Sequence, residues 1–308
     1  MLNFLKLIRY QNLIMIALMQ LLFRYGFLKQ QSGIALALSD FQYMLLVLAT
    51  VCIAAGGFVI NNIMDQETDS ISKPDAVVVG RSISETMAYN IYIAVTVLGV
   101  GIGFYLSNII GKASFSTLFI VIAATLYLYA TSLKQSLLIG NIIVALLLSV
   151  SVIIIGVFDL YPAINDGNQA QMSVLFQILL DYALFAFIIN FIREIVKDLE
   201  DMDGDYNAGM STLPIVLGKA RATKVVFALA FIPVLALIYY INKNLLGLQF
   251  VLYYALLCIL GPLLYFIIKI WSAKTKTEFR FLSSLLKIIL LFGILSIVVI
   301  TLNMKYNA

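Results

Sequence analysis

The sequence contains no histidine, only two cysteines, and few charged residues. Charged side chains make up 12% of its 308 residues, whereas 62% are hydrophobic. A soluble globular domain usually carries about 25% charged residues, so this composition excludes that class and indicates a membrane protein. The absence of histidine excludes catalysis and metal binding by imidazole. We therefore expect any catalytic metal to be held by oxygen atoms, which favours Mg²⁺ over zinc.

Long apolar segments recur along the whole chain, and each is close to the ~20 residues that cross a bilayer as a helix. Both cysteines, Cys52 and Cys258, fall inside such segments, where they are expected to pack as small apolar residues. The pattern predicts an all-α, polytopic membrane bundle that forms a single domain over residues 1–308. The nine predicted spans cover residues 12–28, 41–62, 84–107, 113–131, 137–158, 174–196, 222–241, 248–270 and 283–303.

Basic residues are distributed unevenly between the two ends of these spans. Three quarters of the Lys and Arg residues flank one set of ends, which the positive-inside rule assigns to the cytoplasm. The N-terminus is therefore predicted to lie in the cytoplasm, with the protein in an inner or plasma membrane. The net charge of +4 mostly reflects this rule. We expect membrane lipid around the chain, but neither a nucleic acid nor an obligate protein partner.

Ten of the sixteen acidic residues lie in two segments, one after the second span and one after the sixth. NNIMDQETD at 61–69 aligns with KDLEDMDGD at 197–205, and both contain D-x-x-x-D. This repetition predicts two four-helix repeats plus a ninth helix. Parallel repeats bring equivalent sites to one side of a membrane, so the two motifs are expected to face each other at a cytoplasmic mouth.

The spacing within each segment predicts a shared task for its side chains. In a helix, Asn61, Asp65 and Asp69 would lie on one face, one turn apart. Because like charges on one face repel, a cation is expected between them. Mg²⁺ suits carboxylates that share the ion with a substrate phosphate. The predicted metal ligands are Asn61, Asp65, Asp69, Glu194, Asp198, Asp201 and Asp205.

Basic residues accompany both acidic segments and could neutralise a diphosphate, although the positive-inside rule alone would also supply some of them. Carboxylates, a divalent metal and basic residues at the mouth of an apolar bundle fit a diphosphate that carries a long hydrocarbon tail. The predicted diphosphate-binding cations are Arg9, Lys73, Arg81, Lys134, Arg193 and Lys197.

With these motifs the chain resembles the UbiA superfamily of intramembrane prenyltransferases, whose signatures are N-D-x-x-D-x-x-x-D and a second motif of D-x-x-x-D type. The segments LIRYQN, YATSLKQSLLIGN, SKPDAVVVGRSIS and GMSTLPIVLGKARA also resemble the family. REIVKDLEDMDGD followed by STLPIVLG is most similar to the digeranylgeranylglyceryl phosphate synthase branch. The family usually has Asp at Asn62 and often has Arg-Pro at Ala76 and Val77. By resemblance, Asn12, Asn61 and Asn141 join the predicted substrate-binding residues.

The resemblance implies an enzyme that transfers a prenyl group, with Mg²⁺, from a polyprenyl diphosphate to a lipophilic acceptor, most simply a prenylglyceryl phosphate. An aromatic quinone precursor is the alternative acceptor. The catalytic residues that the resemblance implies are Asp65, Asp69, Asp198, Asp201 and Asp205. The candidate aromatic residues for stabilising a carbocation are Tyr127, Tyr129, Tyr182 and Phe187.

Two other function classes remain open from the sequence. A cation-coupled transporter would place its acids near the bilayer midplane, where Asp181 is the one candidate. A catalytically silent lipid-binding protein would fit the departures at Asn62 and Ala76. GVGIGF at 99–104 resembles a nucleotide-binding fingerprint, but it lies inside a predicted span, so close helix packing is expected there.

Overall fold

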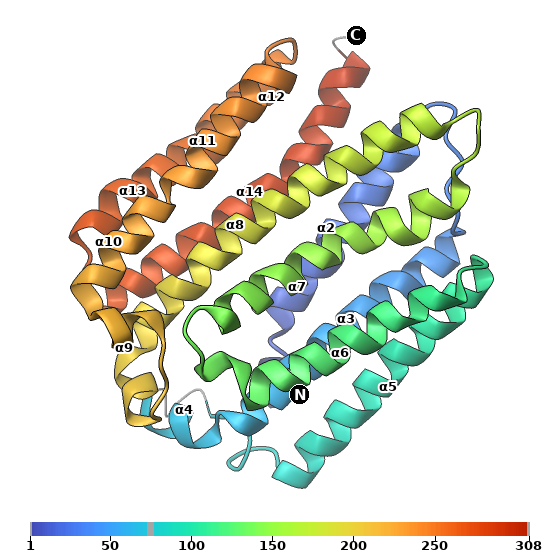
Figure 1. The fold of residues 1–308 in the computed structure, drawn as a ribbon. Helices are drawn as coiled ribbons and strands as arrows, with labels where there is room; N and C mark the ends of the chain where they lie inside the picture. Colours follow the sequence, from blue (N-terminus) through green and yellow to red (C-terminus); the bar gives the residue numbers. More distant parts are fainter. Residues whose placement is uncertain (1, 73–76, 307–308) are drawn as a thin grey trace. The chain divides into compact units, whose positions relative to one another are not determined.

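A computed structural model describes residues 2–72 and 77–306, and this part of the chain is almost entirely helical (Figure 1). It contains no strand other than an isolated bridge between Val79 and Ile83. Within the described residues, nine helical segments are long and apolar enough to cross a membrane, which confirms the predicted all-α membrane bundle. They are Tyr10–Gln30, Asp40–Met64, Glu85–Ile109, Ala113–Thr131, Ile139–Ala163, Gln169–Asn207, Lys219–Leu245, Gln249–Ser272 and Lys276–Tyr306.

The spans are built from α-helices that are joined or extended by short π-helical and 3-10 segments. The α-helices are α1 Leu2–Leu7, α2 Tyr10–Leu21, α3 Asp40–Met64, α4 Gln66–Ser72, α5 Glu85–Ile109, α6 Ser116–Thr131, α7 Ile139–Ile155, α8 Gln169–Asn207, α9 Leu213–Leu217, α10 Lys219–Leu229, α11 Phe231–Tyr240, α12 Gln249–Tyr254, α13 Gly261–Ser272 and α14 Lys276–Tyr306. The π-helical segments are Leu22–Phe27, Gly156–Leu160, Ile241–Leu245 and Ala255–Leu260, and the 3-10 segments are Leu28–Gln30, Ala113–Phe115, Leu133–Gln135 and Tyr161–Ala163.

The helices form two compact units, each assembled from three stretches of the chain. Unit 1 comprises residues 1–21, 33–136 and 151–179, and unit 2 comprises residues 22–32, 137–150 and 180–308. The prediction that residues 1–308 make a single domain stays a prediction.

In unit 1, α3 packs against α5 and α6, and small residues allow the close approach. Gly57 on α3 lies against Leu126, and Gly99 on α5 lies against the carbonyl oxygen of Ala49. Gly103 lies against the ring of Phe119. Helices in a bilayer associate through such packing, because lipid is as apolar as the helix surface. The expectation of close packing at GVGIGF is therefore confirmed at Gly99 and Gly103.

Unit 2 is held together by packing around α14 and by hydrogen bonds between helices. The Tyr182 hydroxyl of α8 lies 2.6 Å from the Ser296 hydroxyl of α14. The Asn303 side-chain oxygen accepts from the backbone N–H of Phe250, at 2.9 Å. Polar groups inside a bundle need such partners, because lipid offers none.

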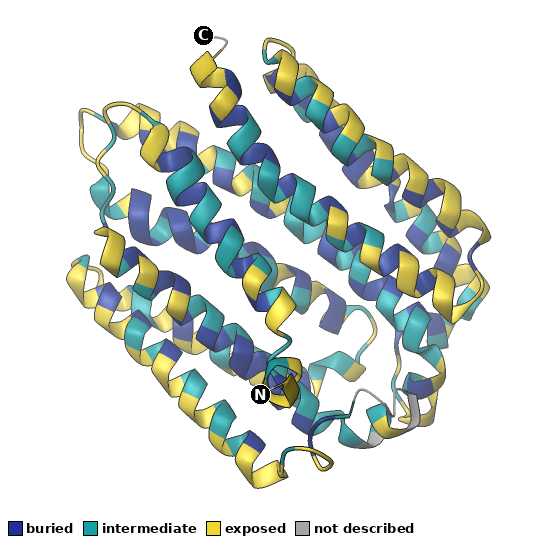
Figure 2. Cartoon of the chain, turned by 180° about the vertical axis from the view of Figure 1, so that it is seen from behind, coloured by how far each residue is buried: buried dark blue, intermediate teal, exposed yellow. Residues whose placement is uncertain are grey.

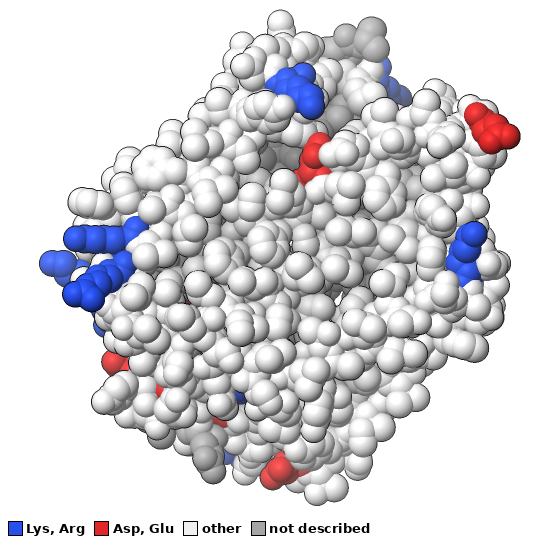
Figure 3. Space-filling model, viewed as in Figure 1, with Lys and Arg blue, Asp and Glu red and all other residues white. Residues whose placement is uncertain are grey.

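The outward surfaces of the helices are apolar, as expected for contact with lipid. Figure 2 shows exposed residues along many of the helices. Large apolar side chains are among the exposed residues, for example Phe41, Val97 and Phe104. Figure 3 shows few charged side chains on the face it presents, and they lie toward its margins. This distribution agrees with an integral, multi-pass membrane protein.

The chain enters its first and fifth spans in the same unusual backbone conformation. Arg9 has φ 48° and Leu138 has φ 58°, both in the left-handed region that non-glycine residues rarely adopt. Each lies three residues before an asparagine, Asn12 on α2 and Asn141 on α7. Because four spans separate one entry from the other, the shared conformation agrees with the predicted four-helix repeat.

Candidate functional site

The first aspartate motif lies where α3 ends and α4 begins. Asp65 leaves helical geometry, with φ −91° and ψ 4°, so the predicted single helix through this motif is interrupted at that residue. The hydrogen bonding nevertheless continues across the break. The N–H of Asp65 donates to the carbonyl of Asn61 at 2.9 Å, and the N–H of Asp69 donates to the carbonyl of Asp65 at 2.8 Å. The three residues therefore keep the predicted spacing of four.

Both carboxylate oxygens of Asp65 have partners within unit 1. The Asn61 side-chain amide donates to Oδ2 at 2.6 Å, and the Lys134 ammonium forms an ion pair with Oδ1. Lys134 comes from the 3-10 segment Leu133–Gln135, directly after α6. The side chains of Asp65 and Lys134 are only 16% and 10% exposed. A mostly buried carboxylate needs such compensation, so the contact brings together two residues that the sequence assigned to one site.

Asn62 stands where the family usually has Asp, and its amide is committed to the backbone. It donates to the carbonyl of Leu7 at 3.2 Å and to that of Phe58 at 2.8 Å. The guanidinium of Arg9 lies over the Phe58 ring, 5.5 Å from its centroid. A carboxylate could not donate either bond. Asn62 thus ties α3 to the end of α1, beside a predicted diphosphate-binding residue.

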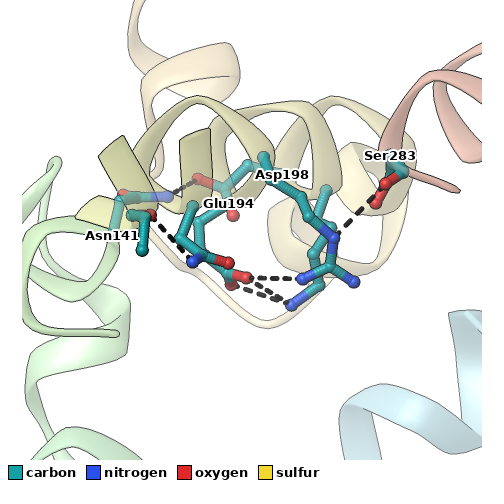
Figure 4. A network of polar contacts seen from close by, with 8 residues as sticks. Asn141, Glu194, Asp198 and Ser283 are labelled. Carbon is teal, nitrogen blue, oxygen red and sulfur yellow. Dashed lines mark hydrogen bonds and ion pairs between the residues drawn. The ribbon is translucent and has the colours of Figure 1, made fainter. Parts of the chain in front are cut away.

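The second aspartate motif lies on α8, which continues unbroken past it to Asn207. The amide of Asn141, near the start of α7, donates to Oδ2 of Asp198 at 2.7 Å (Figure 4). Asn141 is buried, with 8% of its surface exposed. Each motif therefore has one carboxylate that accepts a short hydrogen bond from an asparagine amide.

Glu194 lies one turn before Asp198 and is surrounded by cations of its own helix (Figure 4). The Lys197 ammonium lies 2.8 Å and 3.0 Å from its two oxygens, and an Arg193 nitrogen lies 3.4 Å away. Arg193 also donates through Nε to the carbonyl of Ser283 on α14, at 3.3 Å. Buried Glu194 therefore fixes the positions of both cations.

Sequence reasoning missed two parts of this arrangement. The carbonyl of Ser283 gives no sequence signal, because any residue carries one. Glu200 belongs to the second acidic segment but has no predicted role there, and it accepts from Arg280 Nε at 2.9 Å, which joins α8 to the start of α14.

The other predicted site residues are placed by their helices. Asn12 on α2, Asp69 on α4, and Asp201 and Asp205 on α8 are half-buried, whereas Arg81, in the segment before α5, is exposed. Lys73 and the departure at Ala76 lie outside the described residues. Within residues 2–72 and 77–306, no three acidic or thiol side chains come together as a ready-made metal site. The metal ligands stay a prediction.

The predicted cation-stabilising aromatics make contacts that also serve helix packing. Tyr127 stacks on Tyr92 with ring centroids 6.4 Å apart, and Tyr182 meets Phe23 edge to face at 5.0 Å. Phe187 stacks on Phe191 at 6.2 Å. The proposed role of these rings, including Tyr129 on α6, stays a prediction.

The chain is similar to known proteins in both sequence and structure. Digeranylgeranylglyceryl phosphate synthase of Thermococcus kodakarensis is 34% identical over 182 residues, which are 59% of this chain and 59% of that relative. The chain thus matches about three fifths of that relative's length. A solved structure described as a digeranylgeranylglyceryl phosphate synthase has a TM-score of 0.66 and 24% identity, covering 96% of each chain.

A UbiA homologue from Archaeoglobus fulgidus, solved with DMAPP and Mg²⁺, has a TM-score of 0.60 and 17% identity, covering 96% of this chain and 99% of the homologue. At these identities the two solved structures establish the fold. Residues 27–298, most of the chain, match the UbiA prenyltransferase family, and the chain belongs to that family.

Proposed function

We propose that the protein catalyses Mg²⁺-dependent transfer of a prenyl group from a polyprenyl diphosphate to a prenylglyceryl phosphate. The observation that carries the proposal is the matched pair of aspartates. Asp65 directly follows α3 and Asp198 lies in the C-terminal part of α8, and each accepts a hydrogen bond from an asparagine amide. The name of the Thermococcus relative and the DMAPP and Mg²⁺ in the Archaeoglobus homologue support the same chemistry.

The donor atoms of both motifs suit Mg²⁺, which prefers carboxylate and amide oxygens and shares its shell with substrate phosphate. The side-chain N–H groups of Asn61 and Asn141 donate hydrogen bonds to Asp65 and Asp198. Because Asn61 uses its nitrogen for this bond, its amide oxygen can serve as a metal ligand. When bound, Mg²⁺ would neutralise the negative charge that develops on the leaving diphosphate. The residues proposed to hold it are Asp65, Asp69, Asp198, Asp201 and Asp205, with Asn61 and Glu194 as further candidates.

The protein's own side chains orient these carboxylates and neutralise the substrate. Asn61 and Asn141 fix the rotation of Asp65 and Asp198, as groups that support a metal ligand commonly do. Lys134 supplies positive charge beside the first motif, and Arg193 and Lys197 supply it beside the second. We propose that Arg9, Asn12, Lys73 and Arg81 are further contacts of the diphosphate.

In the proposed reaction the allylic carbon–oxygen bond breaks, and the diphosphate leaves with the electron pair. The allylic cation that remains is attacked by the acceptor hydroxyl oxygen, which forms the new carbon–oxygen bond and releases its proton. Water would capture the same cation, so the apolar interior of the bundle must exclude it. Because positive charge in the loops predicts a cytoplasmic N-terminus, we place the site on the cytoplasmic side.

The proposal is tested with Asp65→Asn and Asp201→Asn in isolated membranes. Labelled geranylgeranyl diphosphate is supplied with geranylgeranylglyceryl phosphate or, in parallel, with an electron-rich aromatic acid. We expect labelled ether lipid from the parent protein with Mg²⁺, and loss of at least about 100-fold from both variants, comparable to losing a group that stabilises transition-state charge. Asp166→Asn, in an exposed loop, is the matched control and should keep parental activity.

Normal activity in both variants, at normal protein levels, would overturn the assignment of the motifs. Label that enters only the aromatic acid would instead show that the family chemistry is right and the proposed acceptor wrong.

A further inference from the structure

Unit 1 contains an apolar groove between α6 and the end of the fifth span, outside the candidate site. Its volume is about 500 Å³, within the ~300–1,000 Å³ typical of ligand pockets. Its walls include Ser114, Thr117, Leu118, Val121, Tyr161 and Phe176.

The groove lies at the end of unit 1 where α3 begins, whereas Asp65 lies where α3 ends. Two hydrogen bonds connect Asp159, which lies between the groove residues Val157 and Tyr161 in sequence, to the residues just before α3. The N–H of Leu38, just before α3, donates to the buried carboxylate of Asp159 at 2.9 Å, and the N–H of Ala37 donates to its carbonyl at 2.9 Å. Since the 25 residues of α3 rise about 37 Å, roughly a bilayer separates the groove from Asp65.

The walls of the groove are fixed by packed aromatic rings. Phe115 lies between Phe158 and Tyr161, with centroids 5.8 Å and 5.9 Å away. Phe176 lies so close to Gly156 that a Cβ there would come within 2.5 Å of the ring. A residue with a side chain at position 156 would displace Phe176, so the glycine shapes the groove.

The groove opens to the lipid-facing surface and has a positive charge beside it. Val121 is 54% exposed and Tyr161 is 49% exposed, which is expected of residues that face hydrocarbon. The ammonium of Lys112 lies over the Tyr161 ring, 5.7 Å from its centroid. Ser114, an exposed residue of the groove wall, adds a hydroxyl two residues after Lys112. A hydrocarbon chain would fill the walls, and a phosphate would complement the cation.

We propose that this groove binds one hydrocarbon chain of an anionic phospholipid, whose phosphate lies against Lys112. Such a lipid combines in one molecule the two features that the site selects, an apolar tail and a negative head group at the membrane surface. The site is separate from the aspartate motifs and does not rest on the proposed prenyl transfer.

The test uses the purified full-length protein in nanodiscs made of phosphatidylcholine. Each sample contains a trace of phosphatidylglycerol or phosphatidylcholine with a photoreactive group on one acyl chain, and cross-linked peptides are identified by mass spectrometry. We expect cross-links in residues 114–121 and 157–176, with phosphatidylglycerol favoured about fivefold, the preference that one basic residue near a membrane surface provides.

Lys112→Gln should remove this preference, and Val121→Trp should reduce cross-linking of both probes because the indole fills the groove. Lys305→Gln and Val97→Trp, on other lipid-facing surfaces, should leave both quantities unchanged. Equal labelling by the two probes in the parent protein, or an unchanged preference in Lys112→Gln, would overturn the proposal. Displacement of the phosphatidylglycerol probe by excess geranylgeranyl diphosphate would also overturn it, because the groove would then hold the prenyl tail.

Discussion

The ammonium of Lys134 forms an ion pair with Oδ1 of Asp65, although 69 residues separate the two in sequence. Because Asn61 occupies Oδ2, the carboxylate is fully compensated within the protein itself. A divalent cation that binds Asp65 must therefore share this oxygen with Lys134 or displace it. Displacement would free the ammonium to bind the substrate diphosphate. Asp65 would then bind the metal while Lys134 binds the diphosphate, as the sequence predicts for each residue.

Replacement of Lys134 tests this arrangement. Lys134→Met leaves a mostly buried carboxylate without its cation. This change should lower the free energy of unfolding in detergent by about 3 kcal/mol or less. Added Mg²⁺ should restore stability to Lys134→Met more than it stabilises the parent, because the metal then supplies the missing charge. Lys134→Arg should keep both the pair and parental stability. Lys243→Gln, a lysine distant in sequence, is the control.

Thermal unfolding followed with and without Mg²⁺ measures these effects. If Mg²⁺ shifts the unfolding of Lys134→Met no more than that of the parent, the metal does not take the position beside Asp65.

A second prediction concerns Asn62→Asp, which restores the residue that the family usually carries. The change removes the two bonds that the amide donates to Leu7 and Phe58 and places a carboxylate beside their carbonyl oxygens. We expect a loss of about 1–3 kcal/mol in stability and lower prenyl transfer. Asn108→Asp is the matched control, because Asn108 also donates to the carbonyl four residues earlier, at 2.8 Å, but is exposed. Higher activity with unchanged unfolding in Asn62→Asp would contradict the anchoring role.

The sequence predicted those features that depend on local spacing. The nine spans follow from the length of each apolar segment, and the contact of Asn61 with Asp65 follows from the helical repeat. The pairs Lys134 with Asp65 and Asn141 with Asp198 were each assigned to the site, but nothing local indicated that they touch, since 69 and 57 residues separate them.

Other features depend on tertiary contacts and could not be read from residue types. The break at Asp65 and the left-handed backbone at Arg9 have no glycine or proline at those positions to indicate them. The role of Asn62 depends on the backbone of Leu7, 55 residues away. At each of these places, neighbouring elements determine the local conformation.

A third prediction separates positioning from metal binding at Glu194. The carboxylate forms ion pairs with Lys197 and Arg193. Glu194→Gln should therefore displace these two basic side chains and have less effect on the binding of Mg²⁺. We expect a KM for the prenyl diphosphate raised about tenfold, comparable to losing one charged hydrogen bond. The Mg²⁺ concentration for half-maximal activity should stay unchanged.

Asp198→Asn should instead raise the Mg²⁺ requirement. Glu200→Gln, which loses an ion pair with the largely exposed Arg280, should change either quantity by less than about twofold. If Glu194→Gln raised the Mg²⁺ requirement as much as Asp198→Asn does, Glu194 would be assigned as a metal ligand.

The last prediction uses three glycines of α5 that differ only in what surrounds them. A Cβ at Gly103 would overlap the Phe119 ring, and one at Gly99 would lie 3.0 Å from the backbone oxygen of Ala49. Phe119 is almost fully buried and the backbone cannot rotate away, so alanine at either position must push α5 from its neighbour. Overpacking of this kind costs about 1–3 kcal/mol.

Gly101 lies on the same helix, but a Cβ there would meet no neighbouring atom within 4 Å, so it provides the control. Gly101→Ala should raise stability by up to about 1 kcal/mol, because alanine favours the helix over glycine. Unfolding temperatures in detergent should therefore fall for Gly99→Ala and Gly103→Ala and hold or rise for Gly101→Ala. Equal shifts in all three variants would show that helix propensity, and not contact with α3 and α6, decides the role of these glycines.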